Sequence, residues 1–312
     1  MVGARRDGVS SVISRFVADL ALAVDIGGTK LACGLVTEAG TLLQRAQVPT
    51  AAASLSGEEL WSHLAALVID VVDRVAADDR IAVCGVGCGG PMSPGGEEVS
   101  PLNITGWRGF PLRRRVAELT GLPTYVDNDA KALALGEGWV GAARGQGDYI
   151  GMVVSTGVGG GVVLDDRLLS GRSGNAGHVG HVIVVPDGRV CPCGGRGCLE
   201  AEASGTAIAA ITGRPAAEAP PELVERTGRL VGLAIASVAN LLDLPLAVLS
   251  GSVALGFGAP FFAAAQSEMD LRCRLDFARG TRVVPGALGD GGPLVGAARV
   301  GWSAIGRGRS GE

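Results

Sequence analysis

The chain lacks the long apolar runs, the basic charge and the paired cysteines that mark several large classes of protein. No apolar run reaches the ~20 residues that a membrane-spanning helix needs. The formal net charge is -4 and the sequence pI is about 5.5, which removes the usual electrostatic case for binding nucleic acid. Seven cysteines, scattered apart from one cluster, make a poor disulfide framework. We therefore expect no membrane or nucleic-acid partner, and a protein of the reducing cytoplasm.

Glycine is the residue that the chain has in excess. It accounts for 51 of 312 residues, more than twice its average share of ~7%. No collagen-like period runs through these glycines, so we interpret them as tight turns and close approaches between backbone segments. The remaining composition, with 47% apolar and 19% charged residues, is that of a globular protein. The length fits about two domains.

The pattern of apolar residues and turns predicts alternating strands and helices from residue 20 onward. Residues 1–19 form a leader of uncertain structure, without the continuous apolar core of a signal peptide. Ser56 and Glu59 have the spacing of a capping box at the start of the first helix. Strands are expected at 20–36 (two strands joined by a Gly-Gly turn), 42–48, 81–90, 123–130 (running into a helix), 149–164 (two strands) and 245–250. Helices are expected at 56–77, 111–121, 129–143, 221–243, 260–275 and 292–305.

The chain contains a loose internal repeat. The stretch 149–164 repeats the strand, glycine turn and strand of 20–36, and Ser155 stands where Asp25 stands in the first copy. Such a repeat predicts two related α/β halves whose glycine turns face each other across a cleft. We expect an N-terminal α/β domain at 20–127, completed by the C-terminal helix 292–305, and a larger C-terminal α/β domain at 128–291.

The first glycine turn has the features of a phosphate-binding loop. The backbone amides of Gly27 and Gly28 can approach an anion closely because no Cβ intervenes. Thr29 adds a hydroxyl, Lys30 adds a positive charge, and Asp25 can hold a hydrated Mg²⁺ ion. An ordinary hairpin turn is the alternative. The turn lacks the spacing of a Walker A loop, and a strand follows it where a dinucleotide fingerprint has a helix.

The second glycine turn follows the same logic and is a stronger signal because it repeats. It comprises Ser155, Thr156, Gly157, Val158, Gly159, Gly160 and Gly161. Two donor-rich turns, one in each half, are suited to hold a polyphosphate between the domains.

A third motif, Asp127-Asn128-Asp129, stands at the C-terminal end of a strand and enters a helix. Ligands of open α/β folds gather at such strand ends. A carboxylate there can take a proton from a substrate hydroxyl as phosphoryl transfer proceeds. Helix capping by Asp127 or Asn128 is the alternative, and it accounts for only one of the three polar residues.

One histidine and three cysteines lie close together in the sequence: His181, Cys191, Cys193 and Cys198. The set matches a closed tetrahedral zinc site, and the proline and glycines among the cysteines supply the turns of a zinc knuckle. The C-x-C spacing is tighter than the usual C-x2-C, so a group of buried free thiols is the alternative. Four protein ligands leave no open position, so we expect a structural zinc.

These four motifs, in this order, resemble the ROK family of sugar kinases and sugar-responsive repressors. The most specific stretches are VDNDAKALALGEGWVGAA at 126–143, STGVGGGVV at 155–163, and SGRSGNAGHVGH with CPCGGRGCLEAEASG between 170 and 205. The resemblance implies a two-domain α/β fold of the actin/hexokinase-like (ribonuclease H-like) type, with an active-site cleft between the domains. It also implies transfer of the γ-phosphoryl group of Mg-ATP to the 6-hydroxyl of a hexose, by a homodimer or a dimer of dimers.

The resemblance also assigns roles to individual residues. Asp129 matches the catalytic base, and His181 is both a zinc ligand and a neighbour of the sugar. The residues that match sugar contacts are Asn103, Asn128, Asp129, His181 and Glu200. The residues that match phosphate and nucleotide contacts are Gly28, Thr29, Lys30, Thr156, Gly157, Val158, Gly159, Gly160 and, through a weaker motif, Gly251 at the adenosine.

Two departures from the family pattern carry information. The family commonly has asparagine two residues after the catalytic aspartate, and this chain has Lys131, which either offsets charge near Asp129 or faces solvent. The family pattern G-E-x-G-H has His178 in place of its glutamate. A carboxylate only accepts hydrogen bonds, whereas an imidazole can also donate one, for example to the carbonyl of an acetamido group at C2 of the sugar.

His178 therefore favours N-acetylmannosamine as the substrate, and bacterial N-acetylmannosamine kinases carry a similar G-H-x-G-H stretch. Glucose is the alternative, because the bare nitrogen of the imidazole can accept from a hydroxyl.

A sugar-sensing repressor of the same family would need a winged helix-turn-helix, for which the ~20 residues before the first strand are too few. A zinc-knuckle interaction module would leave both glycine turns unexplained. Polyphosphate in place of ATP is a variant of the kinase function.

Overall fold

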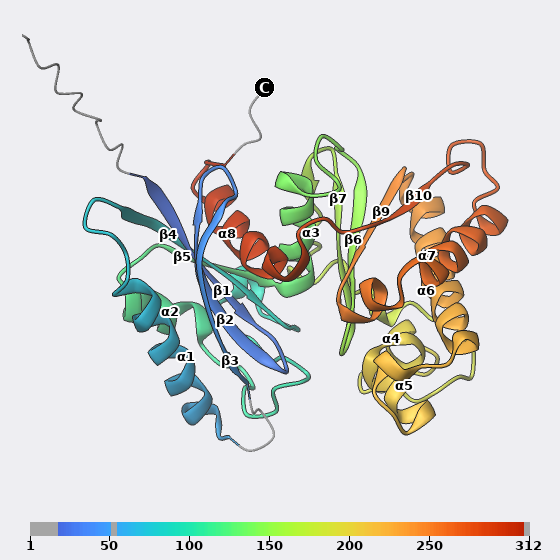
Figure 1. The fold of residues 1–312 in the computed structure, drawn as a ribbon, viewed down its shortest axis with the longest axis horizontal. Coiled ribbons are helices and arrows are strands. Elements are labelled where there is room, and N and C mark those ends of the chain that lie inside the picture. Colours follow the sequence, from blue (N-terminus) through green and yellow to red (C-terminus); the bar gives the residue numbers. More distant parts are fainter. Residues whose placement is uncertain (1–17, 51–54, 309–312) are drawn as a thin grey trace, which may run out of the picture.

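The computed structural model describes residues 18–50 and 55–308, which form two five-stranded sheets with helices packed on them (Figure 1). The strand order is β3-β2-β1-β4-β5 in the first sheet and β10-β9-β6-β7-β8 in the second. Most of the predicted leader 1–19 lies outside the described residues, and Asp19 is the first residue of β1. The first sheet contains β1 (Asp19–Ile26), β2 (Lys30–Thr37), β3 (Leu42–Pro49), β4 (Arg80–Cys88) and β5 (Thr124–Asn128).

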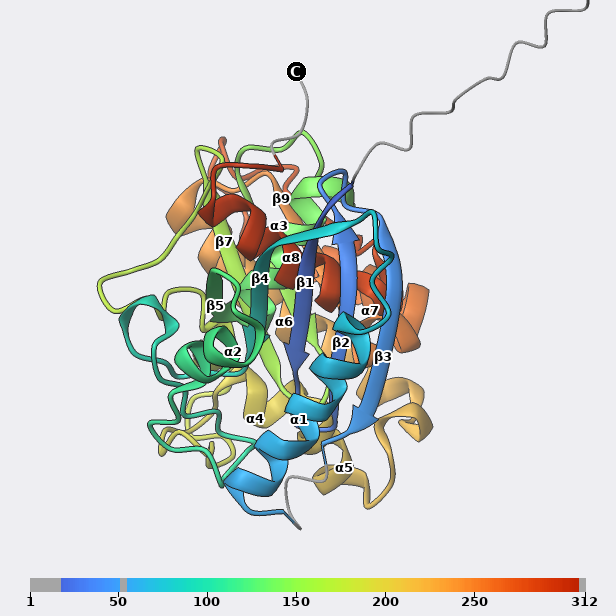
Figure 2. The ribbon, with the colours of Figure 1, turned by 90° about the vertical axis from the view of Figure 1, so that its left-hand side faces the viewer.

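Helices cover both faces of the first sheet, which explains why β1 is buried along almost its whole length (Figure 2). Alternate residues of a strand point to opposite faces. Leu22 and Val24 belong to the core shared with α1 (Gly57–Val72), whereas Ala21 and Ala23 belong to the core shared with α8 (Gly292–Ala304). The small alanine side chains let α8 approach the sheet closely. A helix from the end of the chain thus completes the core of this first half.

The second half repeats the hairpin of the first. It contains β6 (Tyr149–Val154), β7 (Val158–Leu164), β8 (Arg167–Leu168), β9 (Leu246–Ser250) and β10 (Arg282–Pro285). As β1 pairs with β2, β6 pairs with β7 in antiparallel fashion, and β9 is parallel to β6 as β4 is to β1. Apolar residues of β6 share one core with α6 (Pro221–Leu242) and α7 (Ser252–Arg272). The predicted internal repeat is therefore present in the topology.

Two helices lie between the sheets: α3 (Asp129–Val140) and α8 (Figure 1). The two helices pack closely where each has a glycine. A Cβ added at Gly136 of α3 would lie only 3.1 Å from the Cα of Gly296 of α8. A side chain at either position would push the helices apart. This contact fixes α3, whose first residue is Asp129, against the first half of the molecule.

The predicted elements agree with the structure except at ends and in short segments. The capping box is confirmed, because the Ser56 amide donates to the Glu59 carboxylate at 2.8 Å and the Glu59 amide donates to Ser56 Oγ at 3.3 Å. The first helix ends at Val72, five residues before the predicted end. The helix predicted at 260–275 corresponds to the part of α7 that follows a break at Gly258 (φ 62°), and it ends at Arg272; the helical segment from Ser252 to this break was not predicted.

The remaining helices are α2 (Leu112–Thr120), α4 (Leu199–Ala203) and α5 (Gly205–Thr212). Helix α2 was predicted between Pro111 and Gly121, and Gly121 ends it in the left-handed conformation (φ 69°). The short elements α4, α5, β8 and β10 were not predicted. Among the described residues, no helix combines the length and the apolar character needed to cross a membrane.

Candidate active site

A cavity lies where both glycine turns, the start of α3 and the zinc-motif segment meet. Most of the predicted site residues line it: Asp25, Gly27, Gly28, Thr29, Lys30, Asn103, Asn128, Asp129, Thr156, Gly157, Val158, Gly159, Gly160, His178, His181 and Glu200. Gly251 and the three cysteines of the zinc motif lie outside its lining. The structure therefore brings together in one place residues that are spread over 176 positions of the sequence, from 25 to 200.

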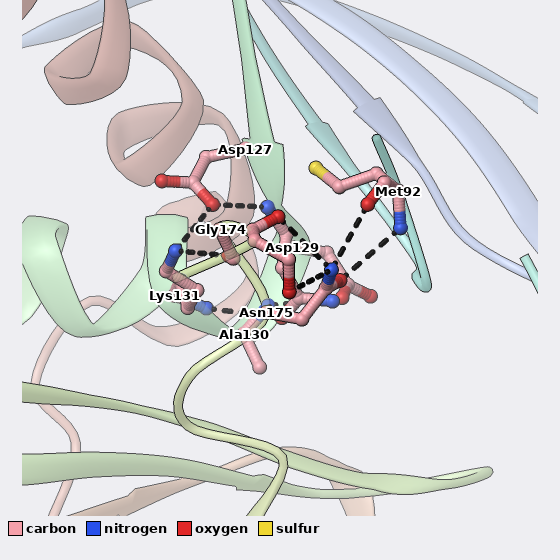
Figure 3. Close-up of polar contacts among 9 residues, drawn as sticks. Met92, Asp127, Asp129, Ala130, Lys131, Gly174 and Asn175 are labelled. Atoms are coloured by element: carbon pink, nitrogen blue, oxygen red, sulfur yellow. Dashed lines mark hydrogen bonds and ion pairs between the residues drawn. The ribbon is translucent and has the colours of Figure 1, made fainter. Parts of the chain in front are cut away.

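Three adjacent polar residues take different roles where β5 runs into α3. Asn128 caps the helix, because its Oδ1 accepts from the amides of Ala130 (3.1 Å) and Lys131 (3.3 Å). Asp127 Oδ1 forms an ion pair with Lys131 Nζ at 2.9 Å (Figure 3). Asn128 and Asp129 line the cavity, whereas Asp127 does not. The capping alternative is thus correct for Asn128, and Asp129 is the one carboxylate of the motif that faces the cavity.

The surroundings of Asp129 make it a stronger proton acceptor than an ordinary carboxylate. Burial raises its pKa, and the negative charge of Glu200 raises it further. The amide of Ala130 donates to Asp129 Oδ1 at 2.9 Å and acts in the opposite direction, by stabilising the ionised form. A carboxylate with a raised pKa at a cavity wall is suited to general-base chemistry.

Lys131 is buried, with 2% of its side chain exposed, so of the two alternatives for this residue the one in which it faces solvent is wrong. Its ammonium group lies between Asp127 Oδ1 and the carbonyl oxygen of Gly174, at 2.9 Å from each (Figure 3). Its ion-pair partner is Asp127 and not Asp129. A buried ammonium group requires such acceptors, because removing it from water is costly.

Thr50 anchors the first glycine turn by hydrogen bonds to its backbone carbonyls. The Thr50 hydroxyl donates to the carbonyl of Gly27 at 2.7 Å, and the Thr50 amide donates to the carbonyl of Thr29 at 3.0 Å. Gly28 meets Asn103 from the facing segment, where an added Cβ would lie only 2.9 Å from the Asn103 Cβ. The second glycine of the turn is therefore required for this close approach.

Asp25 is the other buried carboxylate of the cavity. Burial, followed by the negative charge of Asp129, raises its pKa to about 7, and Lys30 opposes this effect. A divalent cation beside Asp25 would stabilise the ionised forms of both carboxylates. Carboxylate oxygens are ligands that Mg²⁺ prefers. The donor set and its charge thus fit a magnesium site at Asp25.

The second glycine turn is held by the helices that follow it in the sequence. Glu200 Oε2 accepts from the amide of Val158 at 2.9 Å, and the Thr206 hydroxyl donates to the carbonyl of Thr156 at 2.9 Å. A Cβ added at Gly157 would lie 2.7 Å from Glu200 Oε2. Glu200 therefore lies directly against this turn, and the Val158 amide is already engaged by it.

His178 lines the cavity. Burial lowers the pKa of its imidazole, the positive charge of Lys131 lowers it further, and Glu200 acts in the opposite direction. The rings of His178 and His181 stack with centroids 6.0 Å apart. A Cβ added at Gly90 would lie 3.4 Å from His178 Nε2. A neutral imidazole offers one donor and one acceptor, so both the acetamido and the hydroxyl alternatives are chemically available.

The four residues of the zinc motif converge. One ligand atom from each of His181, Cys191, Cys193 and Cys198 lies within 4.8 Å of all the others. The Cys193 and Cys198 sulfur atoms are 3.8 Å apart, and His181 Nδ1 is 3.7 Å from the Cys191 sulfur. Two thiolates bound tetrahedrally at ~2.3 Å to one zinc ion would be about 3.8 Å apart. The residues therefore fit a structural zinc, and the His181 ring also lines the cavity.

A second cavity adjoins the first at Ser155 and Thr156, and its wall includes Ser252 and Phe257 of α7. Gly251 directly precedes this wall in a left-handed conformation (φ 98°), and an added Cβ would lie 2.5 Å from the last carbonyl oxygen of β6. Ser252 Oγ and Ser155 Oγ are 2.9 Å apart. Gly251 thus shapes the junction between β9 and α7 beside this second cavity.

Sequence reasoning missed several residues of the site. Gly90 lines the first cavity beyond the C-terminal end of β4, next to His178. A signal was present, because the buried strand at 81–90 ends in glycines at the sheet edge where β1 and β5 also end. Thr50 and Thr206, which anchor the two turns, carry no motif at all.

Comparison with known proteins agrees with this geometry. The family model described as ROK family matches residues 21–301. The N-acetylmannosamine kinase of Citrobacter koseri is 40% identical over 252 residues, which are 76% of this chain and 84% of that protein. The ROK family glucokinase of Streptomyces griseus, solved with glucose and AMPPNP, superimposes with a TM-score of 0.79 at 30% identity, over 90% of this chain and 99% of that chain. The ROK hexokinase of Thermus thermophilus superimposes with a TM-score of 0.78 at 33% identity, over 92% and 99%. The predicted α/β fold of the actin/hexokinase-like type is confirmed, and it contains two sheets.

Proposed function

The chain belongs to the ROK family, and from this premise we propose that it is an ATP-dependent kinase that phosphorylates the 6-hydroxyl of N-acetylmannosamine. The observation that carries the proposal is that one cavity collects Asp129, both glycine turns and His178. A base, two phosphate loops and a sugar contact are the parts that phosphoryl transfer to a sugar requires. The similarity to the Citrobacter koseri kinase supports the same substrate.

In the proposed reaction, Asp129 accepts the proton of the 6-hydroxyl as the phosphoryl group arrives. Its raised pKa matches this task, because a base that holds a proton more tightly removes it more readily from the hydroxyl. The first glycine turn with Lys30, and the second with Thr156, hold the phosphates of ATP. Mg²⁺ bound at Asp25 would supply neutralisation of the phosphate charge.

In the same proposal, Asn103, Asn128, His181 and Glu200 contact the sugar, and structural zinc holds His181 in place. Neutral His178 donates to the carbonyl of the acetamido group. The adenosine occupies the second cavity beside Gly251, on the far side of Ser155 and Thr156. Closure of a domain at 128–291 toward one at 20–127 and 292–305 would exclude water, which competes with the sugar as acceptor.

Glucose is the second candidate substrate. The Streptomyces griseus glucokinase, to which this chain is similar over nearly its full length, was solved with glucose. The acceptor nitrogen of His178 would then take the place of the carboxylate that the family commonly has. Thiolate ligands and the use of ATP support a cytoplasmic enzyme. A homodimer or dimer of dimers remains a prediction from the family resemblance.

A coupled ADP-release assay with Mg-ATP and four sugars tests the proposal. The panel is N-acetylmannosamine, glucose, mannose and N-acetylglucosamine, and Asp129→Asn measures any contaminating kinase. We expect the highest kcat/KM with N-acetylmannosamine, and a shift toward glucose in His178→Glu. Preference of the unchanged enzyme for glucose would overturn the substrate, and absence of turnover on every sugar would overturn the kinase.

A further inference from the structure

The loop 171–178 determines where His178 lies, and its course is constrained at both ends. It begins at Gly171 in a left-handed conformation (φ 72°) and passes Gly177 (φ 96°) directly before His178. A Cβ added at Gly177 would lie 2.6 Å from the carbonyl oxygen of Gly160 in β7. This end of the loop therefore lies directly on the second glycine turn, while residues 171–173 are exposed.

Lys131 fastens the middle of the loop to the strand and helix that carry Asp129. Its ammonium donates to the carbonyl of Gly174 at 2.9 Å and pairs with Asp127 Oδ1 at 2.9 Å (Figure 3). With 2% of the side chain exposed, the ammonium is shielded from water that could replace the Gly174 carbonyl. Lys131 is two residues from Asp129, so the base and this loop share one support.

Asn175, the residue after Gly174, holds the loop to the half of the molecule that contains the first sheet. Its Oδ1 accepts from the Met92 amide at 3.1 Å, and its Nδ2 donates to the Met92 carbonyl at 2.9 Å (Figure 3). The amide side chain thus pairs with both backbone groups of one residue, as a neighbouring strand would. Met92 lies in the segment after β4 that leads to Asn103, at the other wall of the cavity.

We infer that Lys131 and Asn175 are positioning residues that strap the loop 171–178 across the cavity and thereby set the affinity for the sugar. Neither residue lines the cavity, so both act through His178. Lys131 ties the loop to Asp127 in β5, and Asn175 ties it to Met92 after β4, so both residues hold the loop against the half that contains the first glycine turn. Neither side chain is hydrogen-bonded to a phosphate turn, although the Lys131 backbone packs against Gly161, so we expect the strap to change the affinity for the sugar and to leave the affinity for ATP nearly unchanged. The inference rests on the proposed function, since it takes His178 as a sugar contact.

Steady-state kinetics of strap variants test the inference. Asn175→Leu removes both hydrogen bonds to Met92 at similar volume, and we expect about a tenfold rise in the sugar KM. Asn175→Asp retains the bond to the Met92 amide but not the donor, so its sugar KM should lie between those of the leucine variant and the unchanged enzyme. The double variant Lys131→Met with Asp127→Asn, in which no carboxylate is left unpaired, should also have a higher sugar KM than the unchanged enzyme. The ATP KM should stay within twofold in all of them.

Asn240→Leu is the matched control, because Asn240 on α6 also donates through its side-chain amide to a backbone carbonyl, that of Arg272, away from the cavity. It should leave the sugar KM unchanged. A purely structural role would lower the active fraction, and hence kcat, without separating the two KM values. An unchanged sugar KM in Asn175→Leu, or an equal rise in both KM values, would overturn the inference.

Hydrogen exchange separates failure of the strap from failure of the proposed function, because it needs no turnover. The amide of Ala176 donates to the carbonyl of Ser170, directly before the loop, at 3.0 Å, and it should exchange faster in Asn175→Leu than in the unchanged protein. If the unchanged protein phosphorylates no sugar, the kinase proposal fails while faster exchange still supports the strap. Unchanged exchange of the loop in Asn175→Leu would overturn the strap whether or not the protein is a kinase.

Discussion

The two glycine turns occupy equivalent places in the two halves, yet the structure supports them differently. The first turn is anchored within its own sheet, by Thr50 at the end of β3. The second is anchored by helices that come about 45 residues later, through Glu200 of α4 and Thr206 of α5. Both halves therefore contain the same hairpin, but the residues that anchor its glycine turn differ between them.

The difference explains how one repeated motif serves two purposes. The first turn carries its own charges in Asp25 and Lys30, so it is suited to the charged phosphates and their cation. The second turn carries no charged side chain and instead touches Glu200, which lies two residues after Cys198 of the proposed zinc site. In the proposed function, its position is therefore coupled to the metal and to the sugar.

Asp129 stands where both turns converge, and its loss is expected to produce the largest effect. Asn in place of Asp129 cannot accept a proton, so kcat should fall by about 10²–10⁴-fold. The protein should remain folded, since the change is isosteric and removes a buried charge. ADP release and calorimetry measure the two quantities. Turnover within tenfold of the unchanged enzyme would remove Asp129 from the role of base.

Loss of the metal should affect the second turn and spare the first. We expect about one zinc per chain by mass spectrometry and its loss in Cys198→Ser. kcat/KM for the sugar should then fall about 10- to 100-fold, because small displacements of His181 and Glu200 misalign the sugar. Cys273→Ala, which removes a buried thiol outside the motif, is the control and should retain the zinc. Full activity of a metal-free protein would contradict the assignment.

A matched pair of variants compares the two anchors directly. Thr50→Val and Thr206→Val each remove one hydroxyl that donates to a carbonyl of a glycine turn. Thr50 is fully buried, so its loss leaves an unsatisfied carbonyl and should raise the ATP KM about fivefold, or ~1 kcal/mol. Thr206 is exposed and water can replace it, so the effect should stay below twofold. The reverse order would show that the second turn is the more fragile.

The smallest expected effect is a shift in the pH profile. In the proposed mechanism the enzyme needs ionised Asp129, so kcat/KM should fall as the pH drops through the pKa of this residue. Glu200 raises that pKa, and Glu200→Gln should therefore move the acid limb to lower pH. Thr50→Val, which changes no charge, should leave the limb in place. An acid limb at the same pH in Glu200→Gln would show that its charge does not reach the base.

Features of the site that are local in sequence could be predicted, because their physics is local. The Gly-Gly turn between two apolar runs, the cap at Asn128 and the clustering of His181 with three cysteines each depend on neighbours within about 20 residues. The internal repeat at 149–164 also allowed us to predict that the chain has two related α/β halves. The short helix α4 was missed because five residues contain too little periodicity to recognise, although they carry Glu200.

Contacts between distant residues could not be predicted in the same way. Lys131 was a recognised departure, but its partner Gly174 is 43 residues away and its burial depends on packing that no spacing encodes. Asn175 and Met92 are 83 residues apart, and an asparagine in a glycine-rich loop is ordinary turn chemistry in a single sequence. A single sequence indicates which residues can form a turn. The residues that the turn then contacts depend on the tertiary fold.

The salt bridges at the rim of the first sheet have a consequence for engineering the molecule. Arg307, near the end of the described chain, forms ion pairs with Asp19 and Glu38, so the first and last described segments lie side by side, apart from the residues of the cavity (Figure 1). Chains whose ends meet in this way tolerate circular permutation. A short linker from Gly308 to Ala18, with new ends opened at the exposed turn of Gly213 and Arg214, would place α6, α7 and α8 before β1 in the sequence while leaving each glycine turn on its own support.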